Sequence, residues 1–355
     1  MLFFNRYYPT ICVRRAEMRA MEKLPATEKE KMLPVTLLAP WLNSIEFNNT
    51  FNIVQKSIGS IPIIVDLDRY FEGSSPLPSR KYYSDLCNFD TGYILWEKLI
   101  HSHDNYIPCI QTFNVDKKAI SHQIEYFLKL GRGLVFRFEI ERNYDLDYLF
   151  ERISEIMTDN LLCIFDYGYK EYSTELENRL SNLIDRLISI SPTAKFVISG
   201  ADFPNDFSQF DNFSEAKEIS SRQIFEILRS KYGNYNLYYG DWASTKPRRY
   251  DGGGGTPLPR IDFPTKQRWI IARSKEDNWD FELAAKMITR LPEWDDRPHV
   301  WGTGMIEKTA LGLPGGISTG PEAIACRVNI HLVVQNNYSI PSGSISPKGK
   351  WEDPI

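Results

Sequence analysis

The chain has 355 residues, of which 42% are hydrophobic, so it exceeds one average domain and can bury a large core. Its 42 basic and 46 acidic residues give a net charge of −4, which argues against a protein that coats nucleic acid through a broad basic face. The first apolar residues reach Arg6 at once, a run too short for a signal peptide or a membrane helix, so we expect no membrane segment.

The five cysteines favour a reducing compartment. They form no Cys-x-x-Cys pair, and three of them fall within predicted buried strands, where a free thiol behaves as a small hydrophobic group. We therefore expect reduced, structural cysteines in a cytoplasmic protein. The residues are Cys12, Cys87, Cys109, Cys163 and Cys326.

Eight short apolar runs recur along the first 245 residues, and most are separated by an amphipathic helical stretch. Because eight repeated strand–helix units are typical of a closed parallel barrel, the pattern predicts an α/β fold with a (β/α)8 TIM-type barrel over residues 7–245. The functional groups of such barrels lie where the strands end. The runs are Tyr8–Arg14, Leu33–Pro40, Ile61–Asp68, Ile107–Asn114, Leu134–Ile140, Leu161–Tyr167, Lys195–Ser199 and Asn236–Asp241.

The connections between these runs contain predicted helices that pack on the barrel. Residues 116–130, 145–157 and 174–190 each show one apolar stripe at helical spacing. The connection from Arg69 to Phe89 is longer than most loops, and it is either a lid over the barrel mouth or an irregular surface excursion.

The composition changes after residue 245. Gly252–Gly255 has no place in a regular element, Arg268–Arg273 predicts an added strand, and residues 276–290 predict a helix. A Pro/Gly-rich stretch then leads to a final helix that begins near Thr319 and runs to about Asn336. The predicted parts are a Gly/Pro-rich linker at 246–265, a C-terminal α+β extension at 266–338 and a disordered tail at 339–355.

Charged residues cluster at the predicted strand ends. Side chains alternate along a strand, so Asp66 and Asp68 share one face, as do Arg137 and Glu139. If these faces point inward, several carboxylates and two arginines converge on one barrel mouth. The ligand-binding candidates at these ends are Arg14, Glu17, Asp66, Asp68 and Arg137.

Three kinds of chemistry fit such a ring. Asp66, Glu139 and Asp166 could hold Mg²⁺ or Mn²⁺ for phosphodiester cleavage, with Asp241 as a further catalytic acid. Two carboxylates in different environments could instead act as acid and base. The third alternative is a structural network in which Arg137 and its neighbours neutralise one another. Asp166 is the strongest single candidate, because a buried carboxylate without a partner or a purpose would be costly.

Other signals are weaker. Lys246, Arg248 and Arg249 follow the eighth strand, where barrels often hold phosphate. His101 and His103 have the spacing of metal ligands on a strand, but a solvated helix end explains them better. The sequence contains no nucleophile elbow, phosphate-binding P-loop, dinucleotide fingerprint or zinc-protease motif, and no motif requires a cofactor.

Short motifs at both ends of the chain, in a fixed order, resemble the Beta protein family of satellite phages and bacterial mobile elements. They lie within residues 7–20, 239–273 and 301–331, so the resemblance extends to about residue 338. The motifs are Tyr7-Tyr8-Pro9, Arg14, Ala16-Glu17, Ala20, Tyr239-Gly240-Asp241, Pro247, Pro259-Arg260-Ile261, Trp269-Ile270-Ile271-Ala272-Arg273, Trp301-Gly302 and Asn329-Ile330-His331.

One departure from the family pattern is at the first strand, where Ala16 replaces a glycine and the basic residue before it is arginine instead of lysine. The resemblance implies association with phage-defence loci and toxin–antitoxin-like operons, and it implies no established reaction. By the same resemblance, Glu17, Asp241, Arg273 and His331 become candidates for a shared site. The alternative is that these four residues fasten the C-terminal region to the barrel.

We therefore expect a cytoplasmic component of a phage-defence or toxin-neutralising system that binds a protein partner from the same operon. The alternative is a metal-dependent phosphodiesterase or nuclease with its acidic site at the C-terminal rim of the barrel. A third alternative is a barrel that binds a small or phosphorylated molecule without turnover. The sequence does not decide between an enzyme and a binding protein.

Overall fold

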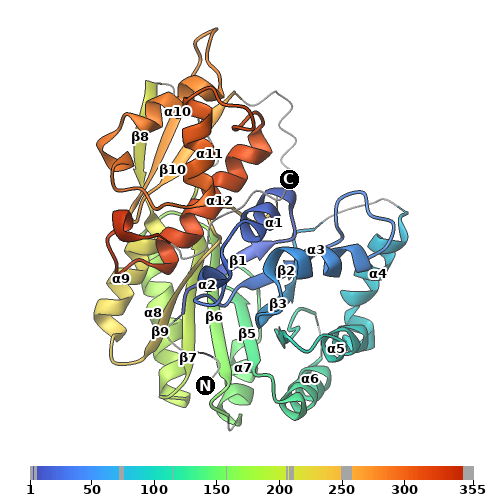
Figure 1. Ribbon diagram of the computed structural model, residues 1–355. Helices are drawn as coiled ribbons and strands as arrows, with labels where there is room; N and C mark the ends of the chain where they lie inside the picture. The colour runs from blue at the N-terminus through green and yellow to red at the C-terminus, as the bar shows by residue number, and fades with distance from the viewer. Residues whose placement is uncertain are drawn as a thin grey trace.

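The computed structural model describes residues 3, 6–71, 76–114, 116–156, 158–204, 207, 212–248 and 258–346. Within them the chain has a mixed α/β fold with two sheets (Figure 1). The larger is a nearly closed, barrel-like sheet of eight parallel strands flanked by helices, and the smaller is an antiparallel sheet of three strands.

The eight strands of the larger sheet are the eight predicted runs. They lie in the order β4-β3-β2-β1-β9-β7-β6-β5, and a single parallel bridge between Cys109 and Val135 links the two outer strands. The prediction of eight parallel strands is therefore confirmed. The strands are β1 (Tyr8–Cys12), β2 (Val35–Leu38), β3 (Ile63–Leu67), β4 (Tyr106–Pro108), β5 (Leu134–Glu139), β6 (Leu161–Tyr169), β7 (Lys195–Ala201) and β9 (Asn236–Asp241).

Amphipathic helices cover the outer face of this sheet (Figure 1). Their apolar stripes pack on outward-facing strand residues such as Ile11, Val65 and Phe165. The helices are α1 (Arg15–Glu22), α2 (Ala26–Lys29), α3 (Asn48–Ile58), α4 (Pro78–Leu86), η1 (Phe89–Thr91), α5 (Ile94–His101), α6 (Lys117–Leu130), α7 (Leu146–Ser154), α8 (Thr174–Ile190) and α9 (Ser220–Tyr232).

The inner face of the sheet changes character along the strands. A separate apolar cluster that includes Tyr8, Val35, Ile64 and Leu162 fills the interior nearer the strand starts. Two or four residues further along the same strands, the inward positions hold charged side chains, as at Asp66 after Ile64 and Asp166 after Leu162. The interior is therefore a packed core that ends in a charged mouth at the carboxyl ends of the strands.

The second unit contains the antiparallel sheet and the helices beside it (Figure 1). Its strand β8 comes from within the barrel sequence, between β7 and α9, and pairs with the central strand β11. The elements are β8 (Asn212–Glu218), β10 (Arg260–Pro264), β11 (Arg268–Ser274), α10 (Phe281–Thr289), η2 (Pro292–Trp294), α11 (Trp301–Ala310), α12 (Gly320–Asn336) and η3 (Ser342–Ser344).

Several of these elements correct the sequence analysis. Strand β8 was not predicted, and β10 lies inside the segment expected to be a linker. Helix α11 lies in the expected Pro/Gly-rich stretch. In the expected tail, η3 is ordered and Ile345 is buried. Gly252–Gly255 and residues 347–355 lie outside the described residues.

Helix α12 is buried on all sides between the two units, because it packs on α1 of the barrel and on β10 and α11 of the second unit. A Cβ atom at Gly302 of α11 would lie 2.5 Å from the carbonyl oxygen of Cys326 in α12, so glycine is needed at this crossing. Asn329 joins both units, since its Oδ1 accepts from the Gly302 N–H and its Nδ2 donates to the Ala20 carbonyl, each at 3.0 Å.

Candidate functional site

Four charged side chains form a buried group at the barrel mouth, which we call the inner mouth cluster: Asp66, Arg137, Glu139 and Asp166. The Arg137 guanidinium lies at its centre. Its Nη2 lies 2.6 Å from Asp166 Oδ2 and 3.4 Å from Glu139 Oε1, and its Nη1 lies 3.0 Å from Asp66 Oδ2. The inward convergence predicted from strand alternation is present, and one cation serves three carboxylates.

The remaining oxygens of this cluster also have partners. Trp242 Nε1 donates to Asp166 Oδ1 at 3.0 Å, and Gln111 Nε2 donates to Asp66 Oδ1 at 2.8 Å. Arg142 pairs with Glu139 Oε2, and Arg69 donates to the amide oxygen of Gln111. Each carboxylate is thus fixed from two sides, which leaves none of the three available as a free base.

Arg137 lies between the three carboxylates that the sequence predicts as ligands of Mg²⁺ or Mn²⁺. Burial disfavours a charged guanidinium, but Asp166, Glu139 and Asp66 raise the pKa of Arg137 well above its ordinary value. The position between these acids is therefore held by a permanent cation. Within the described ranges, no group of three or more His, Cys, Asp or Glu residues has a geometry suited to a metal ion.

A second layer of arginines surrounds the cluster at the rim. Arg248 pairs with Asp68 and donates to the Val13 carbonyl at 3.0 Å. Arg14 lies 3.3 Å from Glu17 and donates to the Lys246 carbonyl at 2.6 Å. The segment after β9 is thereby tied to the loop after β1. Arg249, the third basic residue singled out there, lies outside the described residues.

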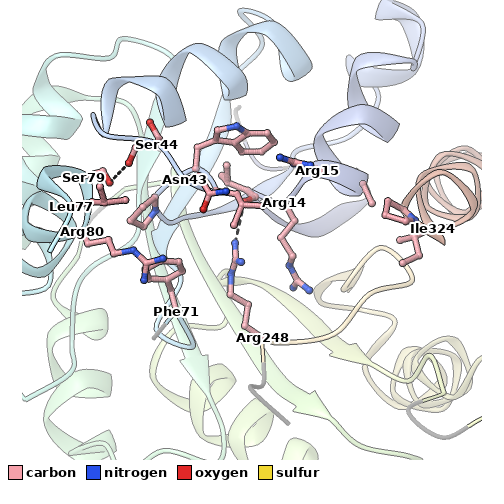
Figure 2. A pocket seen from close by; sticks show the side chains of 16 residues that line it. Arg14, Arg15, Asn43, Ser44, Phe71, Leu77, Ser79, Arg80, Arg248 and Ile324 are labelled. Carbon is pink, nitrogen blue, oxygen red and sulfur yellow. Dashed lines mark hydrogen bonds between the residues drawn. The ribbon is translucent and has the colours of Figure 1, made fainter. Parts of the chain in front are cut away.

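Beside these arginines lies a hollow of about 310 Å³, which we call the rim pocket (Figure 2). Arg14 and Arg15 come from the start of α1, Arg80 from α4, and Arg248 from the segment after β9. None of its described lining residues is acidic. Its other lining residues are Val13, Ala16, Pro40, Trp41, Leu42, Asn43, Ser44, Phe71, Leu77, Ser79, Pro321 and Ile324.

The long connection after β3 helps to build this pocket. Helix α4 lies within it, and the connection contributes Phe71, Leu77, Ser79 and Arg80 to the lining. A second hollow of about 430 Å³ shares Phe71 and Arg80 and is also lined by Arg69 and Arg142. The two hollows therefore form a continuous arginine-rich face at the rim, although residues 72–75 lie outside the described residues.

A different cluster joins the barrel wall to α12. We call this cluster the seam and define it as Tyr7, Asp241 and His331. His331 Nε2 lies 2.7 Å from Asp241 Oδ2, while Tyr7 donates to Oδ1 and Tyr239 donates to Oδ2 at 2.9 Å. Burial opposes ionisation, yet His331 and the hydrogen bonds hold the pKa of Asp241 below its ordinary value.

The turn after β9 links the seam to the mouth. Ala243 and Ser244 have φ values of 46° and 62°, which side chains other than glycine rarely adopt. The Ala243 N–H donates to Asp241 Oδ1 at 2.8 Å, and Thr245 Oγ1 donates to Glu17 Oε1 at 3.1 Å. Since Trp242 reaches Asp166 from the same turn, one short strained segment fixes residues on both sides of the barrel wall.

The candidate residues thus separate into three places. Asp241 faces α12 and is not part of the inner mouth cluster, so the structure does not bring it together with Glu139 and Asp166. Glu17 lies at the rim, and Arg273 lies on β11, where it donates to the Phe207 carbonyl. Of the four residues carried over from the family resemblance, Asp241 and His331 are in direct contact, whereas Glu17 and Arg273 have other partners among the described residues.

Some rim residues were missed by the sequence analysis. Arg15, Trp41, Arg69, Arg80 and Arg142 were not considered as candidates, although Arg15, Trp41 and Arg69 directly follow predicted strand runs. The sequence signal that could have indicated this part of the rim was the presence of arginines and aromatic residues in the connection after β3. Arg80 in fact lies over the Phe71 ring at 5.3 Å from its centre. The expected solvated helix end fits His101, which is the last residue of α5.

Comparisons with known proteins agree with the resemblance noted in the sequence. The family model described as Beta protein matches residues 7–336. A protein named Protein beta, from Enterobacteria phage P4, is 26% identical over 343 residues, which cover 94% of this chain and 93% of that protein. The match therefore includes both the barrel and the second unit.

Proposed function

Since the chain belongs to the Beta protein family, we propose that it is a component of a phage-defence or toxin-neutralising system on a mobile element. It acts by binding a protein partner from the same operon, and it does so without catalysis. A similar protein encoded by a phage supports the link to mobile elements. The binding role rests on the rim, where arginines outnumber carboxylates around an open pocket.

The observation that carries this proposal is the complete pairing of the inner mouth cluster. A general base or a metal ligand needs a carboxylate that is free to take a proton or a cation. Asp66, Glu139 and Asp166 instead hold Arg137, and their other oxygens are occupied by side chains or backbone N–H groups. Carboxylates held in this way keep the barrel mouth rigid. A rigid mouth supports recognition of a partner better than it supports catalysis.

The alternative is a metal-dependent phosphodiesterase or nuclease. It is favoured by the convergence of acids and arginines at the C-terminal rim, where barrel enzymes have their sites. For that function, Mg²⁺ or Mn²⁺ would have to displace the Arg137 guanidinium from its three carboxylates. This cost places the enzyme second, and its argument from fold is an analogy.

We also propose that the larger sheet is a TIM-type (β/α)8 barrel. The support is the neighbour order of its strands, which follows the chain once β8 is set aside, together with the Cys109–Val135 bridge between the outer strands. We propose a cytoplasmic location because the five cysteines are free. In the described part of the chain, no helix is long and apolar enough to cross a membrane.

The test first expresses each gene that neighbours this one in its locus to find one that inhibits growth, and then compares two substitutions in cells that express that gene. Asp166→Asn keeps an acceptor for Trp242 but removes the acid, and Arg80→Glu reverses a rim charge. We expect the wild-type protein and the Asp166→Asn variant to protect growth, and the Arg80→Glu variant to lose this protection. A cooperative thermal unfolding transition should show that all three proteins are folded.

If a folded Asp166→Asn protein loses protection while Arg80→Glu remains active, the phosphodiesterase or nuclease would be favoured over the partner-binding protein. A thermal-shift titration with Mg²⁺ and Mn²⁺ gives an independent answer. We expect no saturable stabilisation of the wild-type protein, whereas stabilisation that Asp166→Asn abolishes would favour the phosphodiesterase.

A further inference from the structure

The rim pocket has an excess of positive charge in an acidic protein. Four arginines line it, and the carboxylates that contact them are Glu17 for Arg14 and Asp68 for Arg248. Arg15 and Arg80 have no carboxylate partner among the described residues. The chain as a whole carries a net charge of −4, so this local surplus opposes the overall sign. A concave cationic surface of this kind concentrates anions.

The arginines of the pocket are positioned in advance. Arg14 and Arg248 are each held by a carboxylate and by a backbone carbonyl, which fixes the direction of their guanidinium groups. Arg80 lies on the Phe71 ring and is half-buried. Figure 2 shows Arg14, Arg80 and Arg248 around the same hollow. Planar guanidinium groups fixed in this way suit phosphate oxygens better than flexible lysines do.

The start of α1 lies at the pocket and adds to its positive potential. Arg15 and Ala16 open this helix, and no side-chain hydrogen bond caps it. The N–H groups of such a helix start favour a negative charge placed close to them. The start of α4 does not contribute in this way, because Pro78 has no N–H and the Ser79 and Arg80 N–H groups donate to the Ile45 and Leu77 carbonyls.

Another part of the pocket wall is apolar. It includes Trp41, Leu42, Leu77 and Ile324, and Leu42 is 54% exposed although it is a large hydrophobic residue. A bare phosphate or a sugar phosphate would leave this wall in contact with water. An aromatic ring attached to the anion would cover it, and flat bases stack favourably on indole rings.

From these features we infer that the rim pocket binds a nucleoside phosphate, with the phosphates among Arg14, Arg80 and Arg248 and the base on the wall that contains Trp41. This inference rests on the proposed function, because it assigns a ligand class to the same rim. The volume of the rim pocket, about 310 Å³, lies within the range of small-molecule sites. The nucleotide would then be a signal that regulates partner binding, without being a substrate.

The experiment is calorimetric titration of the full chain with ATP, ADP, AMP, adenosine and tripolyphosphate. We expect ATP and ADP to bind saturably, and adenosine and tripolyphosphate to bind at least tenfold more weakly than ATP. Arg80→Gln should weaken ATP at least tenfold. Trp41→Leu should weaken ATP but leave the weak binding of tripolyphosphate unchanged.

The matched control is Arg229→Gln, which removes an exposed arginine of α9 and should leave ATP binding unchanged. Equal binding of tripolyphosphate and ATP would overturn the inference, because the apolar wall would then contribute nothing. Absence of nucleotide binding would overturn it as well. If Arg80→Glu still abolishes cellular protection in that case, the partner-binding function stands and the rim pocket recognises an acidic surface of the partner.

Discussion

The inner mouth cluster and the seam both contain buried carboxylates, but they compensate the charge differently. In the mouth, Asp166 is paired with a permanent cation, Arg137, and with the Trp242 indole N–H. In the seam, Asp241 is surrounded by His331, two tyrosine hydroxyls and a backbone N–H. The mouth therefore depends on ion pairs with a permanent cation, whereas the seam depends on several hydrogen bonds to one carboxylate.

The way in which charges are compensated distinguishes residues that stabilise the fold from residues that can bind a ligand. Where the paired charges are also buried, as around Arg137, the residues stabilise the fold and are unavailable to a ligand, whereas Arg14 and Arg248 are paired but partly exposed at the rim. Further out, at the rim pocket, Arg15 and Arg80 have no carboxylate partner among the described residues. Substitutions in the two regions should consequently differ in size and in pH dependence.

The largest effect is expected from Arg137→Met. Removing this cation leaves the buried carboxylates of Asp66 and Asp166 without a counter-charge, while Glu139 keeps Arg142, and should cost about 3–5 kcal/mol of the free energy of unfolding. Urea unfolding measures the loss, with Arg186→Met on the exposed Asp147 pair as a control that changes little. Adding Asp66→Asn and Asp166→Asn should recover part of the loss. A stable single variant would mean that the cluster is not buried.

A smaller loss is expected from His331→Leu in the seam. The change removes the 2.7 Å hydrogen bond to Asp241, but the hydroxyls of Tyr7 and Tyr239 remain as donors. We expect a loss of about 2–3 kcal/mol, typical of a buried charged acceptor that loses one partner. Combining His331→Leu with Asp241→Asn should cost less than the sum of the single changes, and strict additivity would show that the two side chains are not coupled.

Asp202, whose carboxylate interacts with that of Asp241 in the seam, should make a contribution to stability that depends on pH. Burial raises its pKa from 3.8 to about 6, and the Ser221 N–H donates a hydrogen bond to its carboxylate at 2.8 Å. A raised pKa favours the protonated acid in the folded state, so its stabilising contribution is present below pH 3.8 and is lost as the pH rises through 6.

Asp202→Asn should therefore raise the free energy of unfolding by about 1–2 kcal/mol at pH 7.5 and change it little at pH 4.5. Urea midpoints at the two pH values measure this difference. Asp147→Asn, at a 93% exposed carboxylate, serves as the control with no such pH dependence. An equal effect of Asp202→Asn at both pH values would contradict the expected cause.

The smallest effect on stability is expected at the rim. Arg80→Gln removes a half-buried cation with no carboxylate partner among the described residues, so the free energy of unfolding should change by less than about 0.5 kcal/mol. Thermal unfolding without added ligand measures it. A loss as large as that of Arg137→Met would place Arg80 in the structural network and remove it from recognition.

Much of the barrel could be predicted from the sequence, because its strands are apolar runs and most are separated by amphipathic helices. Alternation also predicted that Asp66, Arg137 and Glu139 face one mouth, and the structure contains that group. Alternation could not predict that Asp241 faces the opposite way. Its neighbour Trp242 takes the inward position, and the acid is directed at His331 of α12, which lies 90 residues later in the chain.

The second unit was harder to predict for physical reasons. Strand β10 is short and borders a run of glycines, and α11 contains Gly302 and Gly304, which lower helix propensity. Gly302 is explained only by the close approach of α12. The rim pocket was missed because its arginines come from segments whose proximity depends on the completed fold.

Strand β8 has a consequence for how the protein forms during synthesis. It leaves the ribosome before α9 and β9, yet its hydrogen-bonding partner is β11, which begins roughly fifty residues later. At about 5–20 residues per second, β8 stays unpaired for roughly 3–10 s after it is made. A nascent chain arrested before β11 should therefore expose a free strand edge and be prone to aggregation. Release of the full chain should remove that hazard.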